Sequence, residues 1–180
     1  MPTVIRLCLF LVGAGAAVAA LAGCASGPDS AVGASGPSRS VRAAEVGAML
    51  DDWHRAASRA DGSAYFDRMT GEAVFIGTDD TERWTRDEFM AFAAPYFGAG
   101  RGWTYVPVER HVRVSEAGDV AWADEKLDNE KYGRCRGTAV CVIESGRWKV
   151  AHYTLSFPVP NDLAERVVEL IRAGEAGGQR

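Results

Sequence analysis

GRCRGTAVCVIESGRWKVAHYTLSFPVP, residues 133–160, is the stretch that decides the fold. Two runs rich in β-branched and aromatic residues flank Ser145-Gly146, and such runs around a turn signal predict a β-hairpin. A two-residue turn at this point sets Trp148 opposite Ile143 and His152 opposite Ala139. Any pocket in the protein is expected to be walled by this hairpin and its neighbours.

The stretch before the hairpin extends the sheet by one strand. Residues 120–129 read as a strand, and Glu130-Lys131 reads as a second two-residue turn. This register places Trp122 opposite Ala139 on the middle strand. Trp122 and His152 are therefore expected to lie on one face of the sheet, with room between them above the small middle residue.

The register divides the sheet into two faces that are both rather apolar. We expect the face with Trp122, Asp124 and His152 to line a pocket, and the face with Glu125 and Tyr153 to lie on the reverse. A sheet that is apolar on both sides needs cover on both. Helices can cover one face, and a second copy of the chain is the expected cover for the other, which gives a homodimer. A three-residue loop at the first hairpin would exchange the faces.

Helical patterns precede and follow the strands. Apolar residues at helical spacing predict a first helix over residues 41–60, and Thr85 with Glu88 has the spacing of a capping box for a later helix. A last helix is predicted after Asn161, with its apolar residues facing inward. Helices segregated from a run of long strands predict an α+β fold.

The chain begins with a targeting pattern. Residues 1–23 hold one charge, Arg6, and an apolar run too short for a membrane span, which predicts a signal peptide. The run ends in Leu-Ala-Gly-Cys, which resembles a bacterial lipobox and implies a lipidated Cys24. A plain signal peptide and an N-terminal anchor helix are the alternatives. Acyl chains on Cys24 would anchor the protein stably. The following residues lack an acidic retention signal, which favours the outer membrane of the cell envelope, facing the periplasm.

Composition excludes several classes of function. The net charge of -4 and pI near 5.4 do not indicate a protein that binds nucleic acid. Cys135 and Cys141 on one strand would lie roughly 20 Å apart at about 3.3 Å per residue, too far for a disulfide. We expect both to be small buried residues. No two histidines stand at metal-ligand spacing, so neither a metal nor another cofactor is expected.

Four segments resemble a known family. AVFIGTDDTERW, GWTY, WADEKLDNEKYGRCRG and RWKVAHYTLSFPVPND are similar to SnoaL-like domains of the nuclear transport factor 2-like superfamily. The resemblance implies a cone, in which a strongly curved antiparallel or mixed sheet wraps around N-terminal helices and leaves a cavity at its open end. The extra C-terminal helix would be an addition. The domains expected are a signal (1–23), the lipidated cysteine and linker (24–40), the SnoaL-like domain (41–173) and a loose tail (174–180).

Candidate site residues follow from the predicted faces. Asp124 and His152 could perform acid–base catalysis, but each could instead serve only the structure, through a backbone donor, an arginine or a neighbouring side chain. Residues expected to line a ligand pocket are Trp53, Tyr65, Trp84, Tyr105, Arg110 and Trp122. Arg110 is better explained by an internal ion pair with Asp124 or Glu125, since an unpaired buried arginine is costly.

Two functions from different classes remain open at this stage. The first is an envelope-anchored lipoprotein whose cone binds a small, partly apolar ligand or a protein partner. The second is a small cofactor-free acid–base enzyme of the isomerase, dehydratase or cyclase kind, since the superfamily includes such enzymes alongside binding proteins with no chemistry. A third, structural alternative has a collapsed pocket, with a cavity well below the roughly 300 Å³ of a ligand site, and the dimer face as the working surface.

Overall fold

The computed structural model describes residues 36–176. The predicted signal peptide, Cys24 and most of the linker lie outside the described residues. The helices and strands in chain order are α1 (Arg39–Ser58), α2 (Gly62–Asp67), β1 (Met69–Ile76), β2 (Arg83–Thr85), α3 (Arg86–Gly98), β3 (Val106–Val114), β4 (Val120–Asn129), β5 (Gly133–Glu144), β6 (Arg147–Ser156), the short 3₁₀ helix η1 (Asn161–Leu163) and α4 (Ala164–Ala176).

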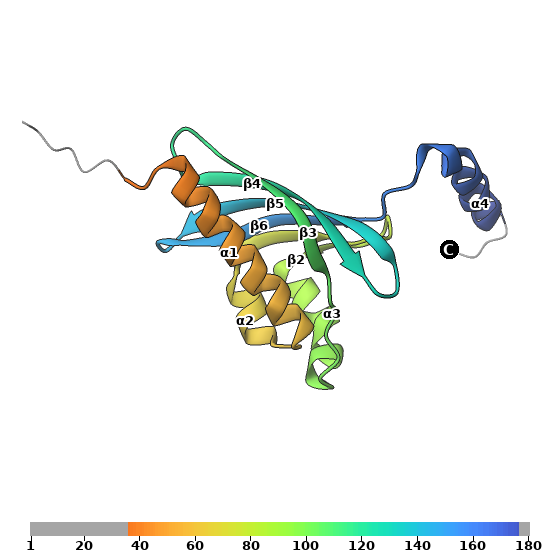
Figure 1. The fold of residues 1–180 in the computed structure, drawn as a ribbon. Helices are drawn as coiled ribbons and strands as arrows, with labels where there is room; N and C mark the ends of the chain where they lie inside the picture. The colour runs from red at the N-terminus through yellow and green to blue at the C-terminus, as the bar shows by residue number, and fades with distance from the viewer. Residues whose placement is uncertain (1–35, 177–180) are drawn as a thin grey trace, which may run out of the picture. The chain divides into compact units, whose positions relative to one another are not determined.

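The six strands form one curved sheet in the order β2-β1-β6-β5-β4-β3 (Figure 1). Strands β1 and β6 are parallel and the other pairs are antiparallel, so the sheet is mixed. Helices α1, α2 and α3 lie on one side of it, and α4 follows the last strand (Figure 1). The predicted α+β fold, with N-terminal helices against a curved sheet and an extra C-terminal helix, is confirmed.

Local sequence explains the helices that cover the sheet. Ser38 caps α1 by accepting a hydrogen bond from the backbone N–H of Val41. The predicted apolar stripe of α1 is buried and includes Leu50 and Trp53. The capping box of α3 is present, because Thr85 and Glu88 each bond the other's backbone N–H. Capping and a buried stripe together fix α1 and α3 against the strands.

The β5–β6 hairpin has the predicted two-residue turn but not the predicted register throughout. Ile143 faces Trp148, as expected. Beyond Cys141 the register shifts, and His152 faces Val140 instead of Ala139. The shift leaves Ala151 as an extra residue in β6, which is a β-bulge. The prediction for His152 was therefore wrong by one residue of β5.

The turn between β4 and β5 holds three residues instead of two. Asn129 pairs with Gly133, and the Asn129 side chain accepts hydrogen bonds from the backbone N–H groups of Lys131 and Tyr132. Gly133 follows with a φ of 68°, a conformation that glycine adopts without steric cost. A turn closed by an asparagine side chain and a left-handed glycine is a known three-residue hairpin loop.

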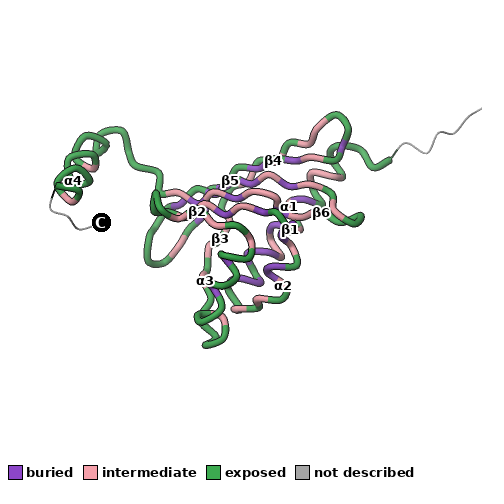
Figure 2. Tube along the Cα trace, turned by 180° about the vertical axis from the view of Figure 1, so that it is seen from behind, coloured by how far each residue is buried: buried purple, intermediate pink, exposed green. Residues whose placement is uncertain are grey.

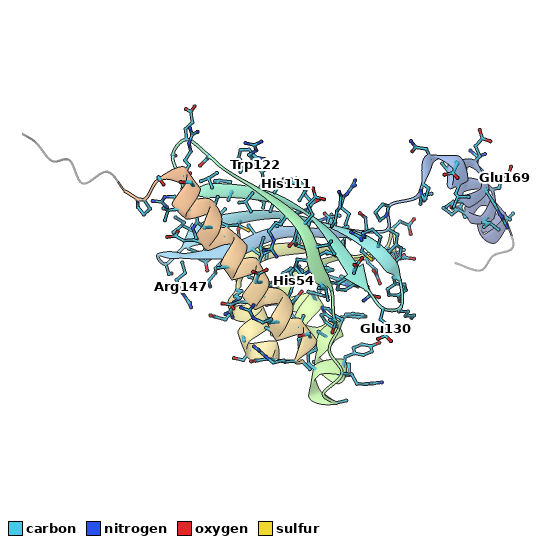
Figure 3. All side chains as sticks on the ribbon, viewed as in Figure 1. His54, His111, Trp122, Glu130, Arg147 and Glu169 are labelled. Atoms are coloured by element: carbon cyan, nitrogen blue, oxygen red, sulfur yellow. The ribbon has the colours of Figure 1, made fainter. Side chains whose placement is uncertain are left out.

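The longer turn exchanges the faces of β4. Trp122 now faces Val140, and its side chain is 49% exposed on the side of the sheet opposite the helices (Figure 3). Ala123 and Glu125 are buried on the helix side instead. Figure 2 shows the same alternation of buried and exposed residues along the strands. The predicted assignment of β4 residues to the two faces was therefore wrong. The turn has three residues instead of two, and this difference of one residue moves each β4 side chain to the other face of the sheet.

Two further expectations concern the cysteines and the last helix. Cys135 and Cys141 are buried and free, as predicted. Helix α4 contains no buried residue, and Leu170 and Ile171 are exposed, so the expected inward face was wrong. Within residues 36–176, no helix is both long enough and apolar enough to cross a membrane.

Candidate functional site

An aromatic cavity lies between the helices and the sheet. Its volume is about 230 Å³. Four of the five tyrosines and three of the five tryptophans of the chain line it. The lining residues are Trp53, His54, Ala57, Tyr65, Phe75, Gly77, Thr78, Glu82, Trp84, Phe89, Phe92, Trp103, Tyr105, Tyr132, Tyr153 and Leu155. We call this cavity the aromatic pocket.

Ring packing holds the wall of the aromatic pocket in place. Trp53 on α1 stacks on Tyr65 of α2 and meets Tyr153 of β6 edge-on, with both pairs of ring centroids 4.7 Å apart. On the other side, Phe75 of β1 stacks on Phe89 of α3 at 4.0 Å. Aromatic pairs in these geometries stabilise a core beyond the area that they bury. The wall therefore joins three helices to the sheet and presents flat apolar surfaces.

One carboxylate is buried directly behind this wall. Glu125 of β4 is 1% exposed and accepts three hydrogen bonds. His54 Nε2 lies 3.1 Å and Tyr153 Oη 2.9 Å from its Oε2, and Arg110 Nε lies 2.6 Å from its Oε1. We call these four residues the Glu125 cluster. His54 and Tyr153 also line the aromatic pocket, so the cluster forms part of its wall.

Strand register and a glycine make room for the Glu125 cluster. Arg110 sits directly opposite Glu125 because an irregularity between Pro107 and Glu109 sets the register of β3. Gly137 of β5 is the other neighbour of Glu125. A Cβ atom at Gly137 would lie 2.0 Å from Tyr153 Oη, too close for any side chain. The absence of a side chain at this position admits the tyrosine hydroxyl to the carboxylate.

The surroundings of Glu125 keep it ionised. Burial by itself would raise its pKa, but the hydrogen bond and charge of His54 and the Arg110 guanidinium outweigh burial and lower the pKa to about 2. Burial, together with the neighbouring Glu125 charge, raises the pKa of Tyr153 well above its usual value. Burial also raises the pKa of Tyr65 well above its usual value and that of Tyr105 to about 12. Tyr65, Tyr105 and Tyr153 are therefore neutral hydroxyl groups at physiological pH.

Two buried nitrogens at this site have no hydrogen-bond partner among residues 36–176. They are Trp53 Nε1, in a pocket-lining residue, and Arg110 Nη2, in the Glu125 cluster. The remaining Arg110 nitrogen, Nη1, donates to the carbonyl of Gly47 and to Asp51, both at 2.8 Å. A buried donor without an acceptor costs about 1–3 kcal/mol.

Four of the predicted pocket residues come together in the structure. Trp53, Tyr65, Trp84 and Tyr105 all line the aromatic pocket. Their role in binding a ligand stays a prediction. Arg110 does not line it and instead forms an ion pair with Glu125, one of the two internal pairs that we considered.

Three other predicted site residues lie outside the aromatic pocket, which corrects their expected placement. Trp122 and Asp124 are exposed on the opposite face because the three-residue turn shifts β4. His152 lies on that face as well, because of the bulge in β6, and its Nε2 is 3.0 Å from Thr154 Oγ1. The predicted catalytic pair, Asp124 and His152, is thus not brought into the cavity.

Sequence reasoning missed the polar residues that do form part of the wall. His54 stands beside the apolar stripe of α1, directly after Trp53 and four residues after Leu50, and that spacing could have placed it against the sheet. Glu125 and Tyr153 were assigned to the reverse face and moved inward with the register. Within residues 36–176, no group of three or more potential metal ligands is present.

Comparisons with known proteins agree with the fold. The family model of the SnoaL-like domain matches residues 46–160. No curated protein matched the chain. Among solved structures, a proposed dehydratase of the NTF2-like (nuclear transport factor 2-like) family from Streptomyces avermitilis has a TM-score of 0.59 at 14% identity, and the match covers 68% of this chain and 100% of that one.

Two more structures show the same fold at low sequence identity. An NTF2-like protein of unknown function from Pseudomonas putida KT2440 matches with a TM-score of 0.57 at 18% identity, covering 68% of this chain and 90% of that one. A proposed aromatic ring hydroxylase from Novosphingobium aromaticivorans matches with a TM-score of 0.57 at 17% identity, covering 69% and 94%. These likenesses show the fold alone. Since the family model spans more than half of the sequence, the chain belongs to the SnoaL-like domain family.

Proposed function

We propose that this protein binds a small, flat, partly apolar molecule in the aromatic pocket. The observation that carries the proposal is a cavity of about 230 Å³ walled by stacked and edge-on aromatic rings. Ligand sites are concave and mostly apolar, with a few polar groups that set orientation. The pocket has this character, with His54 and Tyr153 as polar groups in the wall.

The volume limits the size of the ligand. Sites for drug-sized molecules usually measure about 300–1,000 Å³. The aromatic pocket is smaller, which favours a ligand of one or two fused rings over a long chain or a large polycyclic molecule.

A fluorescent probe can test the proposal. N-phenyl-1-naphthylamine brightens when it leaves water for an apolar site, and we expect saturable brightening with the purified domain. Ala57 is buried in the pocket wall, so Ala57→Leu fills part of the cavity and should weaken binding at least severalfold. Trp122→Leu is the matched control because Trp122 lies on the other face. Equal binding by both variants would refute binding in this pocket.

We also propose that the mature protein is anchored to the bacterial envelope by lipid on Cys24, in the outer membrane and facing the periplasm. The order of small residues before Cys24 supports this, as does the absence of an acidic residue directly after it. Incorporation of labelled palmitate, with Cys24→Ala as the control, tests the modification. Separation of inner and outer membranes then tests the location. Label on the Cys24→Ala protein would contradict the proposed attachment site.

We further propose that the exposed sheet face joins two copies of the chain as a homodimer. Trp122 is 49% exposed there and Val140 is half-buried beside it on the neighbouring strand. A large aromatic residue on such a face favours a protein interface. Sedimentation equilibrium should give a dimer for the wild type and a monomer for Trp122→Lys. A wild-type monomer at high micromolar concentration would overturn this part of the proposal.

A further inference from the structure

The wall of the aromatic pocket contains one acidic side chain, Glu82, and no lysine or arginine. We propose that the ligand is an organic cation, a flat compound with a methylated ammonium or ring nitrogen, whose positive charge lies among the aromatic rings near the Glu82 carboxylate. This inference rests on the proposed binding function and names the chemical class of the ligand. It follows from the charges and the rings that surround the cavity.

The charges in the wall have mainly one sign. Of the sixteen residues that line the aromatic pocket, Glu82 is the only aspartate or glutamate, and none is a lysine or an arginine. His54 is the one lining residue that can gain a positive charge, and its Nε2 lies 3.1 Å from the buried Glu125 carboxylate, which would offset that charge. A cleft that carries charge of one sign between apolar walls attracts ligands of the opposite sign. The wall therefore favours a cation over an anion.

Glu82 is held at the pocket by the turn that precedes β2. Its Oε2 accepts hydrogen bonds from the backbone N–H groups of Thr78 and Asp79, at 2.9 and 3.2 Å. A Cβ atom at Gly77 would lie 2.1 Å from Oε2, so the glycine leaves the space that the carboxylate occupies. In the described part of the chain Glu82 forms no ion pair. Its charge is therefore fixed in position and is not cancelled by a direct partner.

The charge of Glu82 acts on the cavity. Burial is the main cause that raises the pKa of Tyr105 to about 12, and the Glu82 carboxylate adds to the rise. Tyr105 also lines a second hollow beside α1, but Glu82 does not, so the two residues meet at the aromatic pocket. A negative charge that disfavours an anionic tyrosine favours a cation at the same place. A ligand cation near Tyr105 is therefore within reach of Glu82.

Aromatic rings supply the second half of the site. Ten of the sixteen lining residues are phenylalanine, tyrosine or tryptophan. The face of such a ring attracts a cation within about 6 Å of its centroid. The chain itself provides an example, because exposed Lys131 places its Nζ 4.7 Å from the ring centroid of Tyr132, a lining residue. Methylated nitrogen suits such a wall best, since a bare ammonium is strongly hydrated and needs hydrogen-bond acceptors.

Three fused-ring compounds of similar size test the inference on the unaltered protein. They are N-methylquinolinium, 1-methylnaphthalene and 1-naphthoate, which are a cation, its neutral isostere and an anion. Each is titrated at neutral pH against bound N-phenyl-1-naphthylamine, and displacement of this probe gives the affinity. We expect the cation to bind about tenfold more tightly than the anion, and this ratio to shrink as salt is added because salt screens the Glu82 charge.

One variant locates the charge that selects the cation. Glu82→Gln removes the charge and keeps an oxygen that can accept from the N–H groups of Thr78 and Asp79. It should weaken binding of N-methylquinolinium about two- to fivefold, the value of a partly exposed ion pair, and leave 1-methylnaphthalene unchanged. Asp124→Asn is the matched control, since it makes the same change in net charge on the open face of the sheet.

The outcomes separate this inference from the proposed function. Displacement of the probe by the anion as readily as by the cation would overturn the cation preference and leave the binding function intact. Equal losses of cation affinity in Glu82→Gln and Asp124→Asn would overturn the role of Glu82. Urea denaturation identifies a variant that does not fold, and the cation-to-anion ratio of the wild type then decides the matter. If N-phenyl-1-naphthylamine itself fails to bind, the proposed function fails, and the ligand class fails with it.

Discussion

Asp124 and Glu125 are adjacent carboxylates on β4, and their surroundings differ in almost every respect. Asp124 is exposed on the face of the sheet that the helices leave open. Glu125 is buried on the helix side, where it accepts three hydrogen bonds and pairs with Arg110. The comparison teaches that the side of the sheet, and not the residue type, decides whether a carboxylate can contribute to a pocket in this fold.

The largest expected contrast comes from removing each charge in turn. Glu125→Gln removes the buried charge that pairs with Arg110 and leaves only the partly exposed Asp51 as its ion-pair partner, and we expect a loss of about 3–5 kcal/mol in the free energy of unfolding. Asp124→Asn is the matched control and should change that free energy by less than about 0.5 kcal/mol. Urea denaturation measures both. Similar losses for the two variants would contradict the assignment of faces.

Lowering the pH should reveal how much the ionised Glu125 stabilises the wild-type protein. Because the pKa of Glu125 is lowered from 4.5 to about 2 in the folded state, its ionisation stabilises the fold above the unfolded pKa. That contribution, on the order of 3 kcal/mol, is lost as the pH falls from about 5 towards 2. Thermal unfolding across this range should show a steeper decline for the wild type than for Glu125→Gln. Parallel curves would show that Glu125 does not titrate as proposed.

A smaller effect is expected where β5 passes the Glu125 cluster. Gly137→Ala places a methyl group against Tyr153 Oη, and overpacking of this kind costs about 1–3 kcal/mol. Adding Tyr153→Phe removes the hydroxyl and should recover part of the loss. Gly71→Ala is the control, since a Cβ atom there meets nothing within 4 Å. The free energies of unfolding of the single and double variants test this coupling, and strict additivity would argue against it.

The smallest effects should come from the open face. His152 forms a hydrogen bond with Thr154 at the surface of the sheet and does not line the aromatic pocket. We expect His152→Ala to change the free energy of unfolding by about 0.5 kcal/mol or less and to leave N-phenyl-1-naphthylamine binding unchanged. A fluorescence titration compares it with the wild type. A severalfold loss of affinity would show that a change on this face of the sheet affects binding in the aromatic pocket.

Much of the fold could be predicted because its signals are local. The spacing of apolar residues in α1, the capping box of α3 and the Ser145-Gly146 turn each lie within a few residues of sequence. All four aromatic residues expected in the pocket wall, which include Trp53 and Tyr65, line the pocket. Short-range patterns of this kind are little affected by the rest of the chain.

The faces of the sheet depended on two single-residue details. Asn129 closes a three-residue turn through its side chain, and Ala151 is the extra residue of a bulge. Each detail shifts β5 by one residue relative to a neighbour. Trp122 and His152 therefore stay in one row across β5, as predicted, but the row passes through Val140 on the open face and not through Ala139. Asn129 followed by Gly133 was the available signal for the longer turn.

The candidate site was harder to predict because long-range contacts assemble it. Arg110, Glu125 and Tyr153 come from three strands, and His54 comes from a helix far earlier in the chain. No short motif contains them. Only the strand register and the packing of α1 against the sheet bring the four side chains together.

The turn between β4 and β5 limits which mutations of the gene the fold can tolerate. Its three residues set which face of β4 meets the helices, and its third residue, Tyr132, lines the aromatic pocket. Deletion of one residue from this turn would direct Trp122 to the helix side of the sheet, where Ala123 is now buried. It would also remove one side chain from the wall of the aromatic pocket. Insertions and deletions should therefore be far rarer here than amino-acid replacements. Selection should therefore act more strongly on the length of this turn than on its amino-acid composition.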